Sequence, residues 1–80
     1  MLSDLKSLKK VIGAKQTKRA ITSGEAREVY IARDAEARVI APLRELCAER
    51  GVTVVEVDTM RELGTACGIE VGAAIAAVLG

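Results

Sequence analysis

The sequence predicts an α/β fold, a three-layer α/β/α sandwich around a small mixed sheet. Segments with helical spacing of apolar residues alternate along the chain with short apolar runs that suit buried strands. The chain has 80 residues and half of them are hydrophobic, which is enough for one compact core and argues against disorder. We therefore expect a single domain over residues 1–80.

The first quarter of the chain predicts two helices. Four apolar residues recur there at near-helical spacing: Leu2, Leu5, Leu8 and Ile12. This spacing predicts an amphipathic first helix, which Gly13 ends. A second, short helix is expected over residues 15–23 and stops at Gly24. Ala20 and Ile21 supply its apolar side.

The middle of the chain predicts two buried strands on either side of a long helix. Residues 29–32 form an apolar run bounded by charges, and residues 52–57 are rich in β-branched side chains. Between them, residues 34–50 read as a helix. Its apolar face consists of Val39, Leu43, Leu46 and Cys47. Pro42 lies inside this helix and is expected to kink it or to divide off its first turn.

The last third of the chain predicts one helix and one ambiguous segment. Thr59 and Glu62 fit the S/T-x-x-E capping box, so a helix should begin at Thr59. It should end near Cys67, with Gly68 as a left-handed terminator. Residues 71–79 contain alanines that favour a helix, but their length and their position after a glycine-bounded loop suit a strand.

The composition argues against several classes of function. The absence of histidine removes the usual general base and the commonest neutral metal ligand. Tyr30 is the only aromatic residue, which argues against binding of single strands on aromatic platforms. Cys47 and Cys67 form no CxxC pair and are expected to pack in the core of a protein from a reducing compartment. We expect no enzymatic activity, no metal and no cofactor.

The chain reads as a cytoplasmic protein with no membrane segment. The N-terminal lysines are not followed by an apolar run of signal-peptide length. The apolar run over residues 71–79 is too short to span a bilayer. A monomer is the simpler expectation.

The charge distribution indicates one localised surface for an anionic partner. The net charge is only +1, but residues 1–20 hold six basic residues against one acidic residue, a net charge of +5. The remaining residues hold six basic and ten acidic side chains, a net charge of −4. A basic end on a near-neutral domain suits an anionic contact surface. The alternative is a solvated helix face that is rich in lysine.

Residues 13–20 are the first candidate contact segment. They open a helix with three cations and an amide near its N-terminus: Lys15, Gln16, Lys18 and Arg19. Helix N-termini attract phosphates, whereas cations placed there oppose the helix dipole, and such a local conflict is a reason to suspect a ligand. Lysine and arginine can donate to guanine O6 and N7, and glutamine offers both a donor and an acceptor.

Residues 63–72 are the second candidate segment. They place the triplet Ile69, Glu70 and Val71 in a loop bounded by glycines. Apolar side chains near an exposed loop tip could cover nucleotide bases that are no longer stacked. The alternative is that Ile69 and Val71 both turn inward.

At these segments the sequence resembles a known family. Residues 63–74, LGTACGIEVGAA, are close to the signature LG-x-A-x-G-[IL]-E-V-[GA]-AA. Residues 13–20, GAKQTKRA, stand where archaeal members carry G-x-N-E-x-x-K-A, with Lys15 and Gln16 in place of Asn-Glu as in short bacterial homologues. Residues 41–47 match a further segment. Over nearly its whole length the chain is similar to the L7Ae/L30e family of ribosomal proteins, including its YbxF-like bacterial members.

The resemblance implies an α/β/α sandwich with residues 71–79 as a strand. It also implies binding of kink-turn RNA, which bends at a three-nucleotide bulge beside tandem sheared G·A pairs. The major groove of ordinary A-form RNA is too deep and narrow for side chains, whereas a kinked segment exposes guanine edges. Ribosomal RNA or a structured mRNA leader such as a riboswitch would be the partner. The alternative is a protein-interaction module on the same fold that binds no RNA.

The resemblance also implies a role for individual residues. Those at family positions that contact the G·A guanines and adjoining backbone are Lys15, Gln16 and Arg19. Those in the loop that packs on the extruded bulge nucleotides are Ile69, Glu70 and Val71. Gly13 and Ala14 match the helix-opening turn beside the RNA backbone. Lys18 is assigned a phosphate contact on its charge alone, and Arg19 replaces the usual lysine and keeps the cation.

Overall fold

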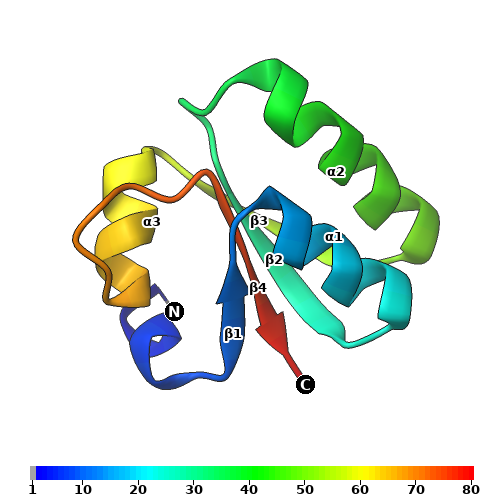
Figure 1. The fold of residues 1–80 in the computed structure, drawn as a ribbon, viewed down its shortest axis with the longest axis horizontal. Helices are drawn as coiled ribbons and strands as arrows, with labels where there is room; N and C mark the ends of the chain where they lie inside the picture. Colours follow the sequence, from blue (N-terminus) through cyan, green and yellow to red (C-terminus); the bar gives the residue numbers. More distant parts are fainter. Residues whose placement is uncertain (1) are drawn as a thin grey trace.

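A four-stranded mixed sheet forms the middle layer of the molecule (Figure 1). The computed structural model describes residues 2–80, with side chains from Leu5 onward. In spatial order the strands are β1 (Lys10–Ile12), β4 (Ile75–Leu79), β2 (Ala26–Ala32) and β3 (Thr53–Val57). β4 pairs antiparallel with both β1 and β2, while β2 and β3 are parallel. The last strand in the sequence is therefore central in the sheet.

Helices cover both faces of this sheet. One layer contains α1 (Ala14–Ser23) and α2 (Ala37–Arg50), and the other contains α3 (Met60–Cys67) and the 3₁₀ helix η1 (Leu2–Ser7) (Figure 1). The prediction of a three-layer α/β/α sandwich around a mixed sheet is confirmed.

The core fills the space between the layers with aliphatic side chains. The largest fully buried apolar side chains are Leu5, Ile21, Val29, Ile31, Leu63 and Ile75. Cys47 and Cys67 are also buried and unpaired, which confirms their predicted place in the core. Burial raises the pKa of both thiols, so the reactive thiolate is disfavoured.

The predicted helix through Ile12 is wrong. Only residues 2–7 are helical, as a 3₁₀ turn, and Lys10–Ile12 form β1 instead. Lys10, Val11 and Ile12 pair with Val78, Ala77 and Ala76 of β4. A helix there would leave this edge of β4 unpaired, and two β-branched residues in succession suit a strand. The ladder with a distant segment thus overrides the local apolar spacing.

The other predicted elements are confirmed with shifted ends. α2 begins at Ala37 and stays continuous through Pro42, so the proline does not divide off a first turn. The cap of α3 is as predicted, because Thr59 Oγ1 accepts the N–H of Glu62 at 3.0 Å. Gly68 ends α3 in the left-handed conformation. The ambiguous C-terminal segment is a strand, β4, but residues 71–74 before it form a loop.

Candidate nucleic-acid interface

The first turn of α1 carries unused backbone donors. Gly13 precedes the helix with φ of 103° and ψ of 156°, a conformation that is close to glycine-only. No side chain caps this end, and its first turn holds no acidic residue. The N–H of Thr17 already bonds to the Gly13 carbonyl oxygen at 3.0 Å. The N–H groups of Ala14, Lys15 and Gln16 have no acceptor inside the helix, so this end suits an anion.

The side chains of α1 divide cleanly into two faces. Thr17, Ala20 and Ile21 are buried against the sheet. The four predicted contact side chains are all exposed: Lys15, Gln16, Lys18 and Arg19. The spacing that buries one face therefore directs the cations and the amide into solvent together.

The three cations of α1 are available for an external partner. Between residues 5 and 80, no carboxylate forms an ion pair with Lys15, Lys18 or Arg19. These three side chains line a shallow hollow of about 480 Å³ together with Thr22 and Ser23. The hollow is a basic surface that runs along α1 from its N-terminal end.

The loop after α3 presents one apolar side chain to solvent. Val71 is 71% exposed, Glu70 is exposed, and Ile69 is half-buried against the core. The alternative that both apolar residues turn inward therefore holds in part for Ile69 and fails for Val71. A single exposed apolar side chain is ordinary on a protein surface, so Val71 gains significance only from the place of its loop next to the basic end of α1.

Close packing holds this loop on α3. A Cβ atom added at Gly64 would lie 2.1 Å from the carbonyl oxygen of Val71, so only glycine fits at this helix position. A Cβ at Gly72 would lie 3.2 Å from the Cβ of Met60. The N–H of Ala73 also donates to the carbonyl oxygen of Met60 at 3.0 Å. The exposed tip is therefore presented by a fixed loop.

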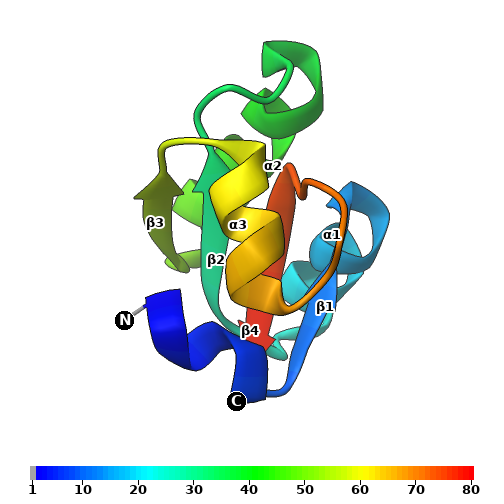
Figure 2. The same cartoon turned by 90° about the vertical axis from the view of Figure 1, so that its left-hand side faces the viewer.

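The two candidate segments meet at one end of the sheet. The N–H of Gly13, at the start of α1, donates to the carbonyl oxygen of Ile75, at the start of β4, at 2.9 Å. The loop over residues 68–74 runs from the end of α3 to Ile75 (Figure 2), so its last residue lies next to the start of α1. Segments more than fifty residues apart in sequence thus border one surface.

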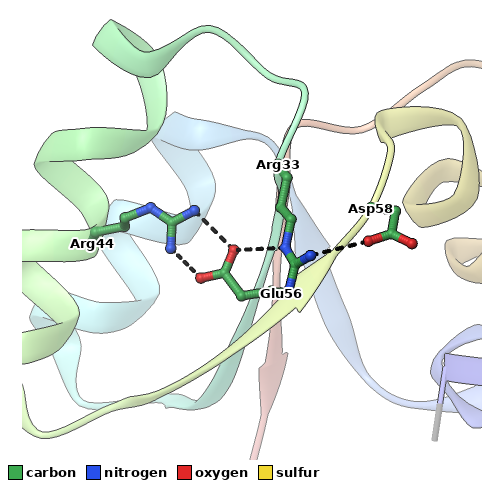
Figure 3. A network of polar contacts seen from close by, with 4 residues as sticks. All are labelled: Arg33, Arg44, Glu56 and Asp58. Carbon is green, nitrogen blue, oxygen red and sulfur yellow. Dashed lines mark hydrogen bonds and ion pairs between the residues drawn. The ribbon is translucent and has the colours of Figure 1, made fainter.

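A network of charged side chains fastens α2 to the sheet (Figure 3). Arg44 of α2 makes two hydrogen bonds to Glu56 of β3, and Arg33 lies 3.9 Å from the same carboxylate and 3.3 Å from Asp58. The hydrogen bond from Arg44 is the main cause of a lowered pKa at Glu56. The sequence alone does not predict this role for Glu56, because Arg44 is twelve residues away along the chain.

A second polar contact was also not predicted. The carboxylate of Asp34, after β2, accepts the N–H of Met60 at 2.8 Å and so caps the first turn of α3 from a distant loop. Met60 also accepts the bond from Ala73. Asp34 therefore helps to hold the end of α3 on which the exposed loop rests.

Among the described residues, no group of three or more His, Cys, Asp or Glu side chains is placed to hold a metal ion. Over the same part of the chain, no helix combines the length and the apolar character needed to cross a membrane.

Comparisons with known proteins agree on one family. The family model described as "Ribosomal protein L7Ae/L30e/S12e/Gadd45 family" matches residues 3–80. An RNA-binding protein of Caldanaerobacter subterraneus subsp. tengcongensis is 52% identical over 69 residues, which cover 86% of this chain and 84% of that protein. RNA-binding protein YbxF of Geobacillus stearothermophilus is 48% identical over 75 residues, covering 94% and 92%.

A solved structure shares the fold. The Giardia lamblia 15.5kD RNA binding protein superimposes with a TM-score of 0.90 at 26% sequence identity. The match covers 99% of this chain and 70% of that one. The arrangement of three helices around a four-stranded sheet is thus that of a known RNA-binding protein.

Proposed function

The chain belongs to the ribosomal protein L7Ae/L30e/S12e/Gadd45 family, and from this premise we propose that it recognises and stabilises kink-turn RNA. It is an RNA-binding protein and not an enzyme. The proposed target is an RNA that bends at a three-nucleotide bulge beside tandem sheared G·A pairs. Ribosomal RNA or a structured mRNA leader, such as a riboswitch, would supply it.

We propose that α1 reads the sheared pairs. The exposed side chains of Lys15, Gln16 and Arg19 project from the end where the backbone donors are free. Lysine and arginine would donate to guanine O6 and N7, and the amide of Gln16 would supply a donor and an acceptor. Lys18 would contact phosphate, while Gly13 and Ala14 would let the RNA backbone approach the helix end.

The loop after α3 would receive the bulged nucleotides. Val71 offers an exposed apolar surface and Ile69 supports it from the core side. Glu70 would lie at the edge of this contact, where a carboxylate can accept from base amino groups. Because the protein has a single, largely buried aromatic residue, the contact with unstacked bases would be aliphatic.

One observation carries this proposal. The hydrogen bond from Gly13 to Ile75 joins the basic helix end to the strand that follows the apolar loop. A surface with a cationic part and an apolar part matches an RNA that exposes phosphates and extruded bases at the same point. The described pairs also leave the cations of α1 uncompensated.

The proposed mechanism is a shift of an RNA population. Free RNA samples extended and kinked forms, and the protein would bind only the kinked form. A preference of about 5.5 kcal/mol for the kinked form would move the equilibrium from 1:99 to 99:1. The fixed loop and the rigid helix end favour this role, because a preformed surface spends little free energy on its own ordering.

We propose that the binding unit is a monomer in the cytoplasm. Both candidate segments lie in one chain, so no second copy is needed to complete the surface. The two buried, unpaired thiols suit a reducing compartment.

The test is a titration of the protein into a short kink-turn RNA with a fluorophore on each arm. Energy transfer would rise as the arms close. A control RNA would have its two G·A pairs replaced by Watson–Crick pairs. We expect tight binding and bending of the first RNA only. Equal, weak binding of both RNAs would show nonspecific attraction and refute kink-turn recognition.

A further inference from the structure

We propose that the groove between α1 and α2 is a second RNA contact. It would bind one unpaired nucleotide beside the proposed kink-turn surface of α1 and the loop after α3. This inference rests on the proposed function for its RNA partner. Its test uses a separate single-stranded probe, so that the two proposals can fail independently.

The groove combines an apolar floor with a cationic edge. It is a hollow of about 320 Å³ between the two helices. Its apolar lining consists of Ala14, Val39, Pro42, Leu43 and Leu46. Lys15 and Lys18 of α1 stand along one side and are exposed. A nucleotide has the matching chemistry, since it joins an apolar base face to an anionic phosphate.

The size of the hollow limits the occupant. A volume of about 320 Å³ is at the lower end of the roughly 300–1,000 Å³ range of small-molecule sites. It therefore fits a single nucleotide better than a longer segment of a partner chain. The base would lie against aliphatic side chains, because no aromatic residue lines the groove.

Pro42 gives the groove a feature that helix stability does not explain. A proline in a helix interior removes one hydrogen bond and costs roughly 3 kcal/mol. α2 nevertheless continues through Pro42, whose ring is exposed in the groove. The pyrrolidine ring offers a rigid apolar surface against which a base can pack. A violated local rule at an exposed position suits a contact site.

The charges around the groove determine where an RNA strand would enter it and how far it would extend. Lys15 and Lys18 belong both to the groove and to the basic hollow along α1, so a strand bound there passes into the groove without a break. The neighbouring hollow shares Lys18, Pro42 and Leu46 with the groove and adds the carboxylates of Glu45 and Glu49. These carboxylates repel phosphates, so the strand should enter beside Ala14 and stop near Leu46.

The test is an NMR titration of methyl-labelled protein with a uridine tetranucleotide and with an abasic tetranucleotide of the same charge. We expect the methyl signals of Val39 and Leu46 to move with the base-bearing probe and not with the abasic one. The titration is then repeated on protein saturated with the kink-turn RNA. The shifts should persist in weaker form, because Lys15 and Lys18 are shared with that surface whereas Val39 and Leu46 of α2 are not.

Two variants and one control sharpen the test. Lys18→Ala should lower the slope of log affinity against log salt for the tetranucleotide by about 0.7, the loss of one phosphate contact on a single strand. Leu46→Gln should weaken binding on the order of tenfold, because it removes part of the apolar surface under the base. Lys9→Ala removes a lysine outside the groove and should change neither value.

Two results would overturn the inference, and a third would separate it from the proposed function. If both tetranucleotides leave Val39 and Leu46 unmoved, the groove is no nucleotide site and its apolar floor is left for a protein partner. If the kink-turn RNA displaces the tetranucleotide, the groove is no separate contact. If the kink-turn RNA fails to bind but the base-bearing probe still moves these methyl groups, the nucleotide site stands and the kink-turn proposal fails.

Discussion

The backbone N–H of Gly13 donates a 2.9 Å hydrogen bond to the carbonyl oxygen of Ile75. This bond fixes the start of α1 against the start of β4, and with it the basic helix end against the apolar loop. The conformation of Gly13, with φ of 103° and ψ of 156°, aims the N–H at this partner. The predicted RNA surface depends on both residues, although neither carries a charged or long side chain.

Gly13→Ala should lower both stability and RNA affinity. Nothing lies within 4 Å of the added Cβ, so the cost is backbone strain of about 1–3 kcal/mol. Gly24→Ala is the matched control at the other end of α1, with φ of 82°. It should cost about 1 kcal/mol and leave RNA affinity unchanged. Urea denaturation and RNA titration of both variants check this. Equal RNA affinity in both would refute the role of Gly13.

Lys15→Ala and Arg19→Ala should each weaken kink-turn binding by on the order of 1–3 kcal/mol. Both side chains are exposed, so neither change should alter the thermal midpoint appreciably. Filter binding at fixed salt measures the effect, and Lys9→Ala controls for the loss of one positive charge. Wild-type affinity in both variants would remove these residues from the site.

Val71→Ser should separate RNA contact from stability. Because Val71 is 71% exposed, its replacement should change the free energy of unfolding by less than about 0.5 kcal/mol. Loss of an apolar contact with an extruded base should weaken kink-turn binding by about 1–2 kcal/mol. Leu8→Ser changes another exposed apolar residue and should leave RNA affinity intact. Isothermal titration of both variants distinguishes a contact from general surface hydrophobicity.

Gly64→Ala should displace the loop that carries Val71. The added Cβ would meet the Val71 carbonyl oxygen at 2.1 Å, so backbone must move. We expect a loss of roughly 2–4 kcal/mol in the free energy of unfolding together with reduced RNA affinity. Gly51→Ala, where nothing lies within 4 Å, should cost about 1–2 kcal/mol through its left-handed backbone alone and should spare binding. Similar binding by both variants would contradict the fixed-loop interpretation.

Arg44→Met should remove a pH-dependent part of stability. The hydrogen bond from Arg44 lowers the pKa of Glu56 in the folded state. The stabilisation from the Arg44–Glu56 pair is therefore complete at pH values above the unfolded pKa of a glutamate, about 4.3. It is lost as the pH falls through the lower pKa of Glu56 in the folded protein. Both side chains are partly exposed, so we expect a loss of only about 0.5–1 kcal/mol at neutral pH.

The control for this variant is Arg38→Met, which breaks the more exposed pair with Glu36. Arg38→Met should change the free energy of unfolding little at any pH. Denaturation midpoints between neutral pH and about pH 3 measure both. An unchanged pH dependence in Arg44→Met would show that Glu56 is held by other groups.

Local patterns predicted the elements whose ends are signalled by nearby residues. The Thr59 cap and the glycine terminators at Gly24 and Gly68 act within one helical turn, and each was found where the sequence placed it. β1 was missed because its strand character comes from pairing with β4, more than sixty residues away. The spacing of Leu2, Leu5, Leu8 and Ile12 does not separate a 3₁₀ turn followed by a strand from one continuous helix.

The candidate RNA surface was also predictable only where it depends on local sequence. The exposure of the α1 cations follows from helical spacing and was predictable. The union of α1 with the loop after α3 came only from the family resemblance, because no local pattern reports that Gly13 meets Ile75. The groove between α1 and α2 was not predicted, since Val39, Leu43 and Leu46 fall on the apolar helix face that looks like an ordinary core face in the sequence.

The central position of β4 has a consequence for synthesis of the protein. β1 and β2 are both made early, but each reaches the other only through β4, which comes last. A nascent chain that lacks residues 75–79 has neither a joined sheet nor the acceptor that orients the start of α1. Its basic segment is already translated by then, yet the complete surface forms only once the last strand has left the ribosome. An RNA that needs both parts of the proposed surface would therefore bind only chains that already include β4.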